Sequence, residues 1–391
     1  MSVSNDRPLV ITNGLVIDPV SGINGTSLDV RVENGCVEFI GESMGYSSGD
    51  KVLDATGLTV TPGLVDVHTH IYEGVCKVGL NPVEAHYLRG VAAAADAGSA
   101  GASNFKGFRK FITEPAPFRI LSFLNVSVLG LIDQRYGELV RPEALHPEDI
   151  AEVYTANKSV IKGLKIRLSH DIVPPGDMLD TLRQAVDIGE ELSIPLMAHV
   201  GHTEQTLAEI VEVLRPGDIV THCFTGKGNG ILVDGEIDPK VLEARERGVL
   251  FDVGHGTTQM SYAIARTAIQ NGFAPDLIGS DLSMNNWQTP AFDLATVMSK
   301  MIALGMSSID ALEATTARPA EVLGIGGEGY GAIVPGLPAF LTIFEVGKSR
   351  VTLPDSAGDA LPVDRWEPKY LVTGGKIQET IAWRGLDKGL E

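Results

Sequence analysis

The stretch Leu64-Val65-Asp66-Val67-His68-Thr69-His70 decides the fold class, because a short apolar run leads directly into a His-x-His pair. Residues i and i+2 of a β-strand face the same side, so both imidazoles would leave the end of one strand together and could bind one metal ion. A His-x-His pair also arises by chance in a chain with nine histidines, so the other histidines decide its meaning. The stretch predicts a strand that ends in metal-binding side chains.

Other candidate ligands also follow short strand-like runs. These are His199 after Pro195-Leu196-Met197-Ala198, His222 after Ile219-Val220-Thr221, Asp281 after Leu277-Ile278-Gly279-Ser280, and Lys165 within Gly163-Leu164-Lys165-Ile166-Arg167-Leu168. In a (β/α)8 barrel the carboxyl ends of the strands converge on one face, where the active site is built. Imidazole nitrogen and carboxylate oxygen are ordinary ligands of zinc and similar divalent ions. We therefore expect these side chains to meet around metal ions.

Strand-like and helix-like segments alternate between Pro62 and Leu304. Taken as eight strands, the apolar runs recur about every 30 residues, which is roughly the length of a βαβ unit. The predicted strands are Leu64 to Val67, Val91 to Ala95, Ser122 to Val128, Val160 to Leu168, Pro195 to Val200, Asp218 to Val220, Val249 to Val253 and Leu277 to Gly279. This pattern predicts an α/β fold, a (β/α)8 TIM barrel, with a doubly wound sheet as the structural alternative.

Both ends of the chain are predicted to form antiparallel sheet. Asn34-Gly35 separates two strand-like runs near the N-terminus, and Gly374-Gly375 does the same near the C-terminus, as type I′ hairpin turns require. Neither end has enough strands for a core of its own, so we expect the two to pair. The predicted division is a small β-sandwich domain from residues 1–61 and 326–391, and a metal-binding catalytic barrel over residues 62–325.

Composition excludes several classes of protein. The 391 residues are 44% hydrophobic and 21% charged, which excludes a disordered chain or a coiled coil. A net charge of −19 disfavours binding to nucleic acid or to an anionic membrane surface. The longest nearly apolar stretch is too short to span a bilayer, and the first ten residues lack the pattern of a secretory signal. We expect a cytoplasmic homo-oligomer that acts on a small-molecule substrate.

Lys165 requires a separate argument, because a lysine among Leu164, Ile166 and Leu168 is costly to bury as a cation. Its pKa should fall, which favours the neutral and reactive amine. A neutral amine beside two divalent cations can add carbon dioxide, and the two oxygens of the resulting carbamate can bridge metals about 3.5 to 4 Å apart. Lys162, on the opposite strand face, is the rival candidate. A lysine that only extends from the barrel end would leave one well-formed metal site.

The complete set resembles the amidohydrolase superfamily, with His-x-His after the first strand, lysine on the fourth, histidines on the fifth and sixth, and aspartate on the eighth. The lead-in Thr61-Pro62-Gly63-Leu64-Val65-Asp66 is also typical, and the resemblance covers nearly the whole chain. It implies two divalent ions, with zinc as the first choice, and a carbamate formed from carbon dioxide. The implied ligands are His68 and His70 for one ion, His199 and His222 for the other, Lys165 as the carbamate bridge, and Asp281 as ligand and proton shuttle.

Three motifs resemble a branch of this superfamily that is related to dihydroorotases and often labelled dihydroorotase or adenine deaminase. They are Asp96-Ala97-Gly98-Ser99-Ala100-Gly101, Gly163-Leu164-Lys165-Ile166-Arg167 and Asp252-Val253-Gly254-His255-Gly256. The branch suggests hydrolysis of an amide or ester bond in a small acylated carboxylate. A hydroxide that bridges the two metal ions would attack the carbonyl, and Asp281 would carry its proton to the leaving nitrogen or oxygen.

Three alternatives remain open. One is hydrolysis of a cyclic amide, as by a dihydroorotase. A one-metal aminopurine deaminase is another, but such enzymes usually carry glutamate three positions after the strand-five histidine, where this chain has His202, and lack the strand-four lysine. The last is an inactive barrel that serves as an assembly protein, which the loss of a ligand would indicate, yet all six positions are filled.

Two residues are predicted to bind substrate. Arg167 shares a strand face with Lys165 and could pair with a substrate carboxylate, or form a salt bridge at the top of the barrel. His255, in the glycine-flanked loop after the seventh strand, could contact substrate or support a metal ligand. Further pocket candidates are Cys76, Lys106, Arg109 and His202, and ordinary surface or helix positions are predicted for His86, His146 and His170.

Overall fold

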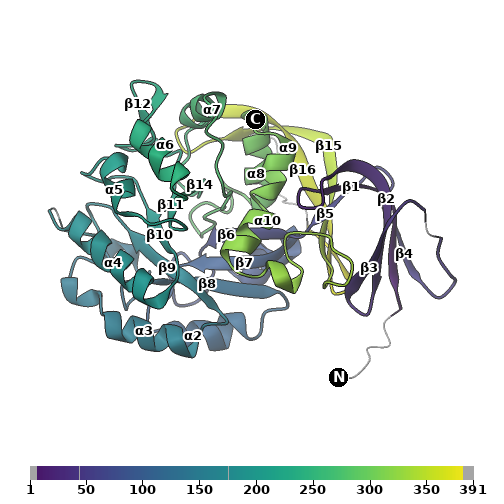
Figure 1. The fold of residues 1–391 in the computed structure, drawn as a ribbon, viewed down its shortest axis with the longest axis horizontal. Coiled ribbons are helices and arrows are strands. Elements are labelled where there is room, and N and C mark those ends of the chain that lie inside the picture. The colour runs from purple at the N-terminus through teal and green to yellow at the C-terminus, as the bar shows by residue number, and fades with distance from the viewer. Residues whose placement is uncertain (1–6, 44, 175, 382–391) are drawn as a thin grey trace.

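The computed structural model describes residues 7–43, 45–174 and 176–381, and two sheets organise them (Figure 1). One sheet forms the wall of a barrel that is surrounded by helices. The other gathers strands from both ends of the chain. Among the described residues, no helix combines the length and the apolar character that a membrane crossing requires.

Parallel strands form the barrel wall in the spatial order β14-β11-β10-β9-β8-β7-β6. The order follows the chain, as expected for successive βα units. The first seven predicted strands are confirmed here with boundaries shifted by a few residues. The strands are β6 (Leu64–Thr69), β7 (Val91–Ala97), β8 (Arg119–Asn125), β9 (Ile161–Arg167), β10 (Leu196–His199), β11 (Ile219–Thr221) and β14 (Leu250–Asp252).

Residues 277–282 occupy the eighth position of the barrel, between β14 and β6, without forming a regular strand. Leu277 bridges to Asp252 on one side, and Leu282 bridges to Thr69 on the other. Gly279 lies so close to both neighbours that an added Cβ would be 2.6 Å from His68 Cβ. This close approach brings the end of the segment against the end of β6.

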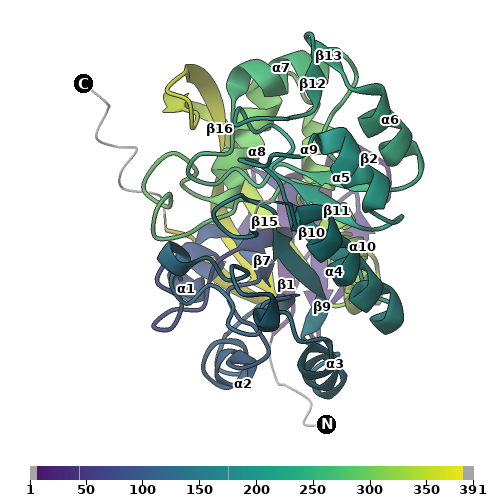
Figure 2. The same ribbon diagram turned by 90° about the vertical axis from the view of Figure 1, so that its left-hand side faces the viewer.

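The helices cover the outside of the barrel, and Figure 2 shows α2 to α6 at the periphery of the strands. Several begin with a side-chain cap, such as the capping box of Thr206 and Glu209 at α5. The helices are α1 (Pro82–Ala85), α2 (Phe105–Phe108), α3 (Pro147–Ala156), α4 (Met178–Leu192), α5 (Leu207–Val213), α6 (Pro239–Glu246), α7 (Tyr262–Gln270), α8 (Leu294–Ala303), α9 (Ser308–Glu313) and α10 (Ala317–Val322). A two-stranded ribbon, β12 (Leu232–Val233) and β13 (Glu236–Ile237), precedes α6.

The two chain ends share one sheet, in the order β17-β16-β15-β5-β1-β2-β3, with β4 paired to β1. β15 pairs antiparallel with β5 and joins the two ends, as predicted. Both predicted hairpin turns are present, with φ of 52° and 82° at Asn34 and Gly35 and of 57° and 80° at Gly374 and Gly375. The strands are β1 (Leu9–Asp18), β2 (Ile23–Glu33), β3 (Cys36–Gly41), β4 (Lys51–Asp54), β5 (Thr59–Pro62), β15 (Phe340–Pro354), β16 (Ala360–Thr373) and β17 (Lys376–Glu379).

The long hairpin of β15 and β16 extends from this sheet over the barrel toward α7 and α8 (Figure 1). It packs against the helices through apolar side chains and through buried hydrogen bonds. The amide of Trp366 donates to Ser299 Oγ over 3.0 Å, and the amide of Tyr262 donates to Asp355 Oδ2 over 2.8 Å. The terminal sheet is therefore fastened to the barrel close to the loops that follow its last strands.

Candidate active site

The predicted ligands of the first metal ion lie together at the carboxyl end of the barrel. The Nε2 atoms of His68 and His70 are 3.4 and 3.1 Å from Asp281 Oδ1. One ligand atom from each of the three residues lies within 4.8 Å of the others, a spacing that could hold a metal ion. The amide of Asp281 donates to the carbonyl of His68 over 2.7 Å, which holds the aspartate beside the histidine pair.

The remaining predicted ligands adjoin this group. Lys165 Nζ lies 3.1 Å from His68 Nε2, and His222 Nε2 lies 2.8 Å from His199 Nδ1. The ring centres of His68 and His222 are 5.3 Å apart, so the two sets of ligands are neighbours. The structure therefore brings together all six side chains that the sequence singled out. The rival Lys162 is on the other face of β9, where the charges of Arg119 and Glu328 act on it.

The Nδ1 atom of His68 is held by two buried groups, Thr221 Oγ1 at 2.8 Å and Asp252 Oδ2 at 3.0 Å. Because an ionised carboxylate only accepts hydrogen bonds, the ring proton of neutral His68 belongs on Nδ1, and Nε2 is left as the ligand atom. Sequence reasoning assigned no role to Asp252. Its position at the end of β14, matching that of the other site residues, was the available signal.

The rings of His222 and His70 are also oriented by contacts of their Nδ1 atoms. His222 Nδ1 lies 2.6 Å from the carbonyl oxygen of Gly254, which can only accept, so Nε2 of His222 is free toward His199. His70 Nδ1 lies 2.9 Å from Ser99 Oγ. These contacts fix the direction of each ring, a common arrangement around metal ions in proteins.

Burial lowers the pKa values of basic groups in the cluster and so favours their neutral forms. It lowers the pKa of the Lys165 amine to about 8, although the carboxylates of Asp281 and Asp252 act in the opposite direction. It also lowers the pKa of His222 to about 3 and that of His199 well below its usual value. Neutral imidazole is the form that binds metal ions.

Asp281 remains a carboxylate. Burial by itself would raise its pKa, but the interactions with the imidazoles of His68, His70 and His222 outweigh that effect and place the pKa below its ordinary range. The cluster thus combines neutral nitrogen donors with an anionic oxygen donor, which suits divalent metal ions.

A cavity of about 290 Å³ opens onto the cluster. All of its described lining residues except Leu131 have polar or charged side chains, and they include Arg167, whose Nη1 atom lies 3.3 Å from Oε2 of the buried Glu138. Sequence reasoning missed Glu138, which is in a loop and has no local motif. The lining residues are His70, Leu131, Gln134, Lys165, Arg167, His199, Thr257, Thr258, Gln259, Asp281, Ser283 and Asn285.

The model of the amidohydrolase family matches residues 59–377, which contain the whole barrel and the metal cluster. The chain belongs to this family and is a hydrolase. A deacetylase of Brucella anthropi is 35% identical over 95% of this chain and 92% of its own length. A solved structure described as a dihydroorotase has a TM-score of 0.88 at 32% identity, covering 96% of this chain and 98% of its own. One described as an adenine deaminase has a TM-score of 0.88 at 28% identity, covering 96% of this chain and 100% of its own.

His255 is fully buried in this amidohydrolase and does not belong to the cavity lining. Its Nε2 atom lies 2.9 Å from Nζ of the buried Lys300, and its Nδ1 atom lies 3.0 Å from the carbonyl oxygen of Gly256. Both ring nitrogens thus have partners within the protein. The backbone of His255 belongs to the loop that faces the metal cluster, but its side chain is not part of the cavity lining.

The other pocket candidates lie away from the cavity lining. Cys76 is buried, and burial raises the pKa of its thiol to about 12. Lys106 and Arg109 line a separate groove beside α2 and α3. His202 is exposed, with its ring centre 5.9 Å from that of His170.

His86, for which an ordinary surface or helix position was predicted, is the C-cap residue of α1 and is fully buried, so a surface position is wrong. Its Nε2 atom lies 3.1 Å from Asp66 Oδ2, and the other oxygen of Asp66 accepts from the amide of His68. The error arose because the short helix that contains its neighbours packs against the barrel wall. His146 and His170 are exposed, as expected.

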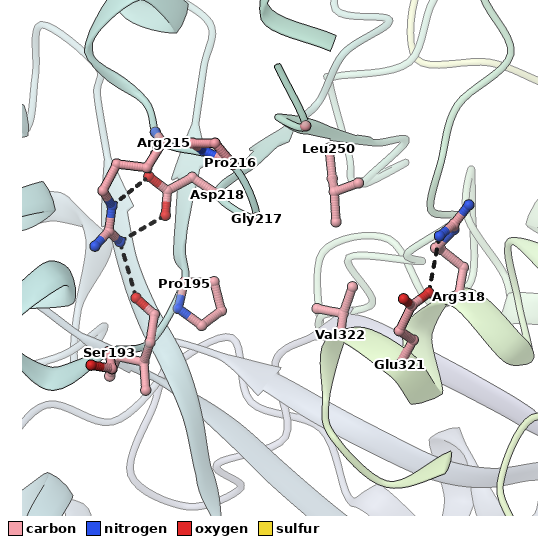
Figure 3. Close-up of a pocket in the computed structure, with 12 residues that line it drawn as sticks. Ser193, Pro195, Arg215, Pro216, Gly217, Asp218, Leu250, Arg318, Glu321 and Val322 are labelled. Carbon is pink, nitrogen blue, oxygen red and sulfur yellow. Dashed lines mark hydrogen bonds and ion pairs between the residues drawn. The ribbon is translucent and has the colours of Figure 1, made fainter. Parts of the chain in front are cut away.

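A larger cavity of about 510 Å³ lies at the opposite end of the barrel, at the amino ends of β10, β11 and β14. Its charged groups are already paired: Arg215 with Asp218, and Arg318 with Glu321 (Figure 3). Catalytic groups of barrels of this type are found at the carboxyl ends of the strands. The smaller cavity at the metal cluster is therefore the candidate active site.

Proposed function

We propose that this amidohydrolase uses two divalent metal ions, with zinc as the first choice, to hydrolyse an amide or ester bond in a small acylated carboxylate. The observation that carries the proposal is the convergence of six donor side chains at the carboxyl end of the barrel, where four of them line one cavity. One ion would be held by His68 and His70 and the other by His199 and His222, while Asp281 would be a further ligand and Lys165 would contribute as a carbamate.

The residues fit this metal centre. Lys165 is 1% exposed, and its Nζ atom has contacts with His68 Nε2 and with Met197 Sδ, neither of which neutralises a cation. A buried ammonium is unfavourable, and the nearby carboxylates of Asp281 and Asp252 offset this cost only in part, since the pKa of Lys165 is still lowered. Reaction of the neutral amine with carbon dioxide would remove that cost, because a carbamate is an anion and two adjacent cations would balance it.

Bound together, two divalent cations would supply a water of lowered pKa and would polarise the substrate carbonyl. The protein's own contribution is Asp281, a carboxylate at neutral pH that can accept a proton and pass it to the leaving nitrogen or oxygen. Its backbone is fixed from two sides, since its amide donates to His68 and its carbonyl accepts from Asn286 Nδ2 over 2.7 Å. These two contacts hold the backbone of Asp281 beside the histidine pair.

The cavity favours a small polar substrate. Its volume of about 290 Å³ is at the lower end of the usual range for small-molecule sites, and Leu131 is the apolar side chain among its described lining residues. Arg167 brings guanidinium donors to the cavity, and a carboxylate is their natural partner. The relative named deacetylase, which aligns along nearly the whole chain, supports an acylated substrate.

A cyclic amide is the second candidate substrate, and the structural similarity to a protein described as a dihydroorotase favours it. The same donors would act on a ring amide. A one-metal aminopurine deaminase has weaker support. Apart from imidazoles, no aromatic ring is among the described lining residues, and His202 is exposed where such enzymes usually carry glutamate.

Metal analysis of the purified protein tests the metal centre. We expect about two ions per chain, loss of activity on chelation, and recovery with metal plus bicarbonate but not with metal alone. Lys165→Ala should reduce the stoichiometry to about one ion, whereas Lys162→Ala, the control on the same strand, should leave it at two. A single ion in the wild type that Lys165→Ala does not affect would contradict the proposal.

A parallel substrate screen tests the reaction. N-acyl amino acids, O-acyl 2-hydroxy acids, cyclic ureides and aminopurines would be compared under one set of conditions. We expect turnover of acylated carboxylates. Turnover of cyclic ureides alone would favour the second candidate, and release of ammonia from an aminopurine alone would refute both.

A further inference from the structure

Lys300 on α8 is a fully buried lysine that the proposed reaction does not use. Its Nζ atom reaches three acceptors on three separate segments. These are His255 Nε2 at 2.9 Å, the carbonyl of Pro290 in the loop after Asp281, and the carbonyl of Pro354 at the end of β15, at 2.9 Å. One side chain therefore connects two loops at the carboxyl end of the barrel with the terminal hairpin.

The contacts of Lys300 and His255 define which atoms of this pair carry protons. An ammonium group has three donors, and Lys300 has three acceptors. His255 Nδ1 lies 3.0 Å from a carbonyl oxygen, so Nδ1 carries a proton and Nε2 accepts from Lys300. Burial and the neighbouring lysine hold the pKa of His255 well below its usual value, so the ring is neutral. Burial also lowers the pKa of Lys300 to about 7, against the opposing charges of Asp355 and Asp293, so the positive charge that this pair can carry belongs to Lys300. The rings of Tyr262 and Phe292, at 5.8 and 5.5 Å, help to compensate it.

The loop Gly254-His255-Gly256 is what this pair holds in place. The carbonyl of Gly254 accepts from His222 Nδ1 over 2.6 Å. Gly256, with a φ of 56°, lies against the carboxylate of Asp281, so that an added Cβ would be 2.4 Å from Oδ2. One short loop thus supports a predicted ligand of each metal ion. His255 is the one residue of this loop with a side chain beyond its backbone.

We propose that Lys300 is a positioning residue of the metal centre, which it supports through His255. Lys300 anchors the ring of His255, the ring anchors the Gly254–Gly256 backbone, and that backbone orients His222 and confines Asp281. The contact with Pro354 includes the terminal hairpin in the same unit. This inference rests on the metal centre proposed above.

The test compares two substitutions on one helix in the zinc-loaded full-length protein. Lys300→Met keeps the length of the side chain but removes its donors. Ser299→Ala, the control, removes the buried hydrogen bond from Trp366 of the same hairpin without touching the loop. Zinc affinity is measured by competition with a chromophoric chelator, next to kcat and KM. We expect Lys300→Met to weaken binding of one zinc ion roughly 10- to 100-fold and to lower kcat more than it raises KM. Ser299→Ala should change zinc affinity less than about 3-fold.

His255→Gln provides an independent route if Lys300→Met does not fold. Its amide oxygen can still accept from Lys300, whereas the donor to the Gly256 carbonyl is lost, so zinc affinity should again fall. The double variant Lys300→Met/His255→Gln should bind zinc no more weakly than the single variant with the lower zinc affinity. Both substitutions act through one connection, so their effects should not add. Zinc affinity at the wild-type level in both single variants would overturn this inference alone. A wild-type protein that binds no zinc would overturn the metal centre as well.

Discussion

Arg167→Met separates two roles of the arginine that lines the cavity. The side chain of Arg167 is 13% exposed and that of its partner Glu138 is 3% exposed, with 3.3 Å between the charged atoms. The guanidinium can therefore bind a substrate carboxylate with donors that Glu138 does not occupy. The substitution removes that donor set and leaves Glu138 without its cation.

The expected losses in kcat/KM and in stability follow from the two contacts of Arg167, one with the substrate carboxylate and one with Glu138. A hydrogen bond to a charged group contributes about 1.5–3 kcal/mol, which corresponds to a loss of roughly 10- to 150-fold in kcat/KM for a carboxylate substrate. Removal of one member of a buried ion pair costs about 3–5 kcal/mol of stability. Burial already raises the pKa of Glu138 against the opposing charge of Arg167. Without the arginine this pKa rises further, so protonation of Glu138 should bring the stability cost to about 3 kcal/mol or less.

The assay compares a carboxylate substrate with its primary amide, both carrying the same acyl group. Arg167→Met should reduce kcat/KM for the carboxylate and change the amide little. The double variant Glu138→Gln/Arg167→Met should regain most of the stability lost in denaturant unfolding but none of the discrimination between the substrates. An equal loss for both substrates would refute carboxylate recognition by Arg167. Undiminished stability of the single variant would refute the buried ion pair.

Three further predictions concern the metal cluster. Asp252→Asn should weaken metal binding roughly 10- to 100-fold in a chelator competition, because the ring of His68 loses its anionic acceptor; unchanged affinity would contradict the assigned orientation. Gly256→Ala should lower kcat without removing any functional group, since the new Cβ displaces Asp281; wild-type kcat would show that the carboxylate can move freely. In the metal-free protein, burial lowers the pKa of His222 from 6.5 to about 3, so between these values the unfolded state binds more protons and stability falls as the pH falls. Denaturant unfolding of the metal-free protein should show that the free energy of unfolding falls by about 1.4 kcal/mol per pH unit below pH 6.5 for each such histidine. A free energy of unfolding that does not change with pH in this range would contradict the lowered pKa of His222.

The positions of the metal ligands were predictable because they follow local rules. The alternation of strands and helices sets the direction of every strand, and a residue that ends a strand in such a barrel must lie on the catalytic face. His68, His199 and His222 met this condition, Lys165 lies near the carboxyl end of β9, and all four lie together in the structure. The hairpins at both chain ends were equally local, since Asn34-Gly35 and Gly374-Gly375 favour one type of turn.

The eighth strand shows where local reasoning stops. Leu277 to Gly279 was predicted as a strand from its apolar run, yet the segment has only isolated bridges to β14 and β6. Its position is nevertheless the expected one. Barrel closure leaves it so close to His68 that Gly279 has no room for a side chain, and this constraint exists only once both neighbours are in place.

By itself, the sequence determined which side chains leave the catalytic end of the barrel, because strand direction and side-chain alternation depend on residues close together in the chain. The tertiary structure decided what supports them. Asp252 is 184 residues from His68, Glu138 is 29 from Arg167, and Lys300 is 45 from His255. No spacing rule connects residues at such separations. Their contacts arise from barrel closure and from the packing of loops and terminal hairpin around the cluster, where every buried polar group needs a partner.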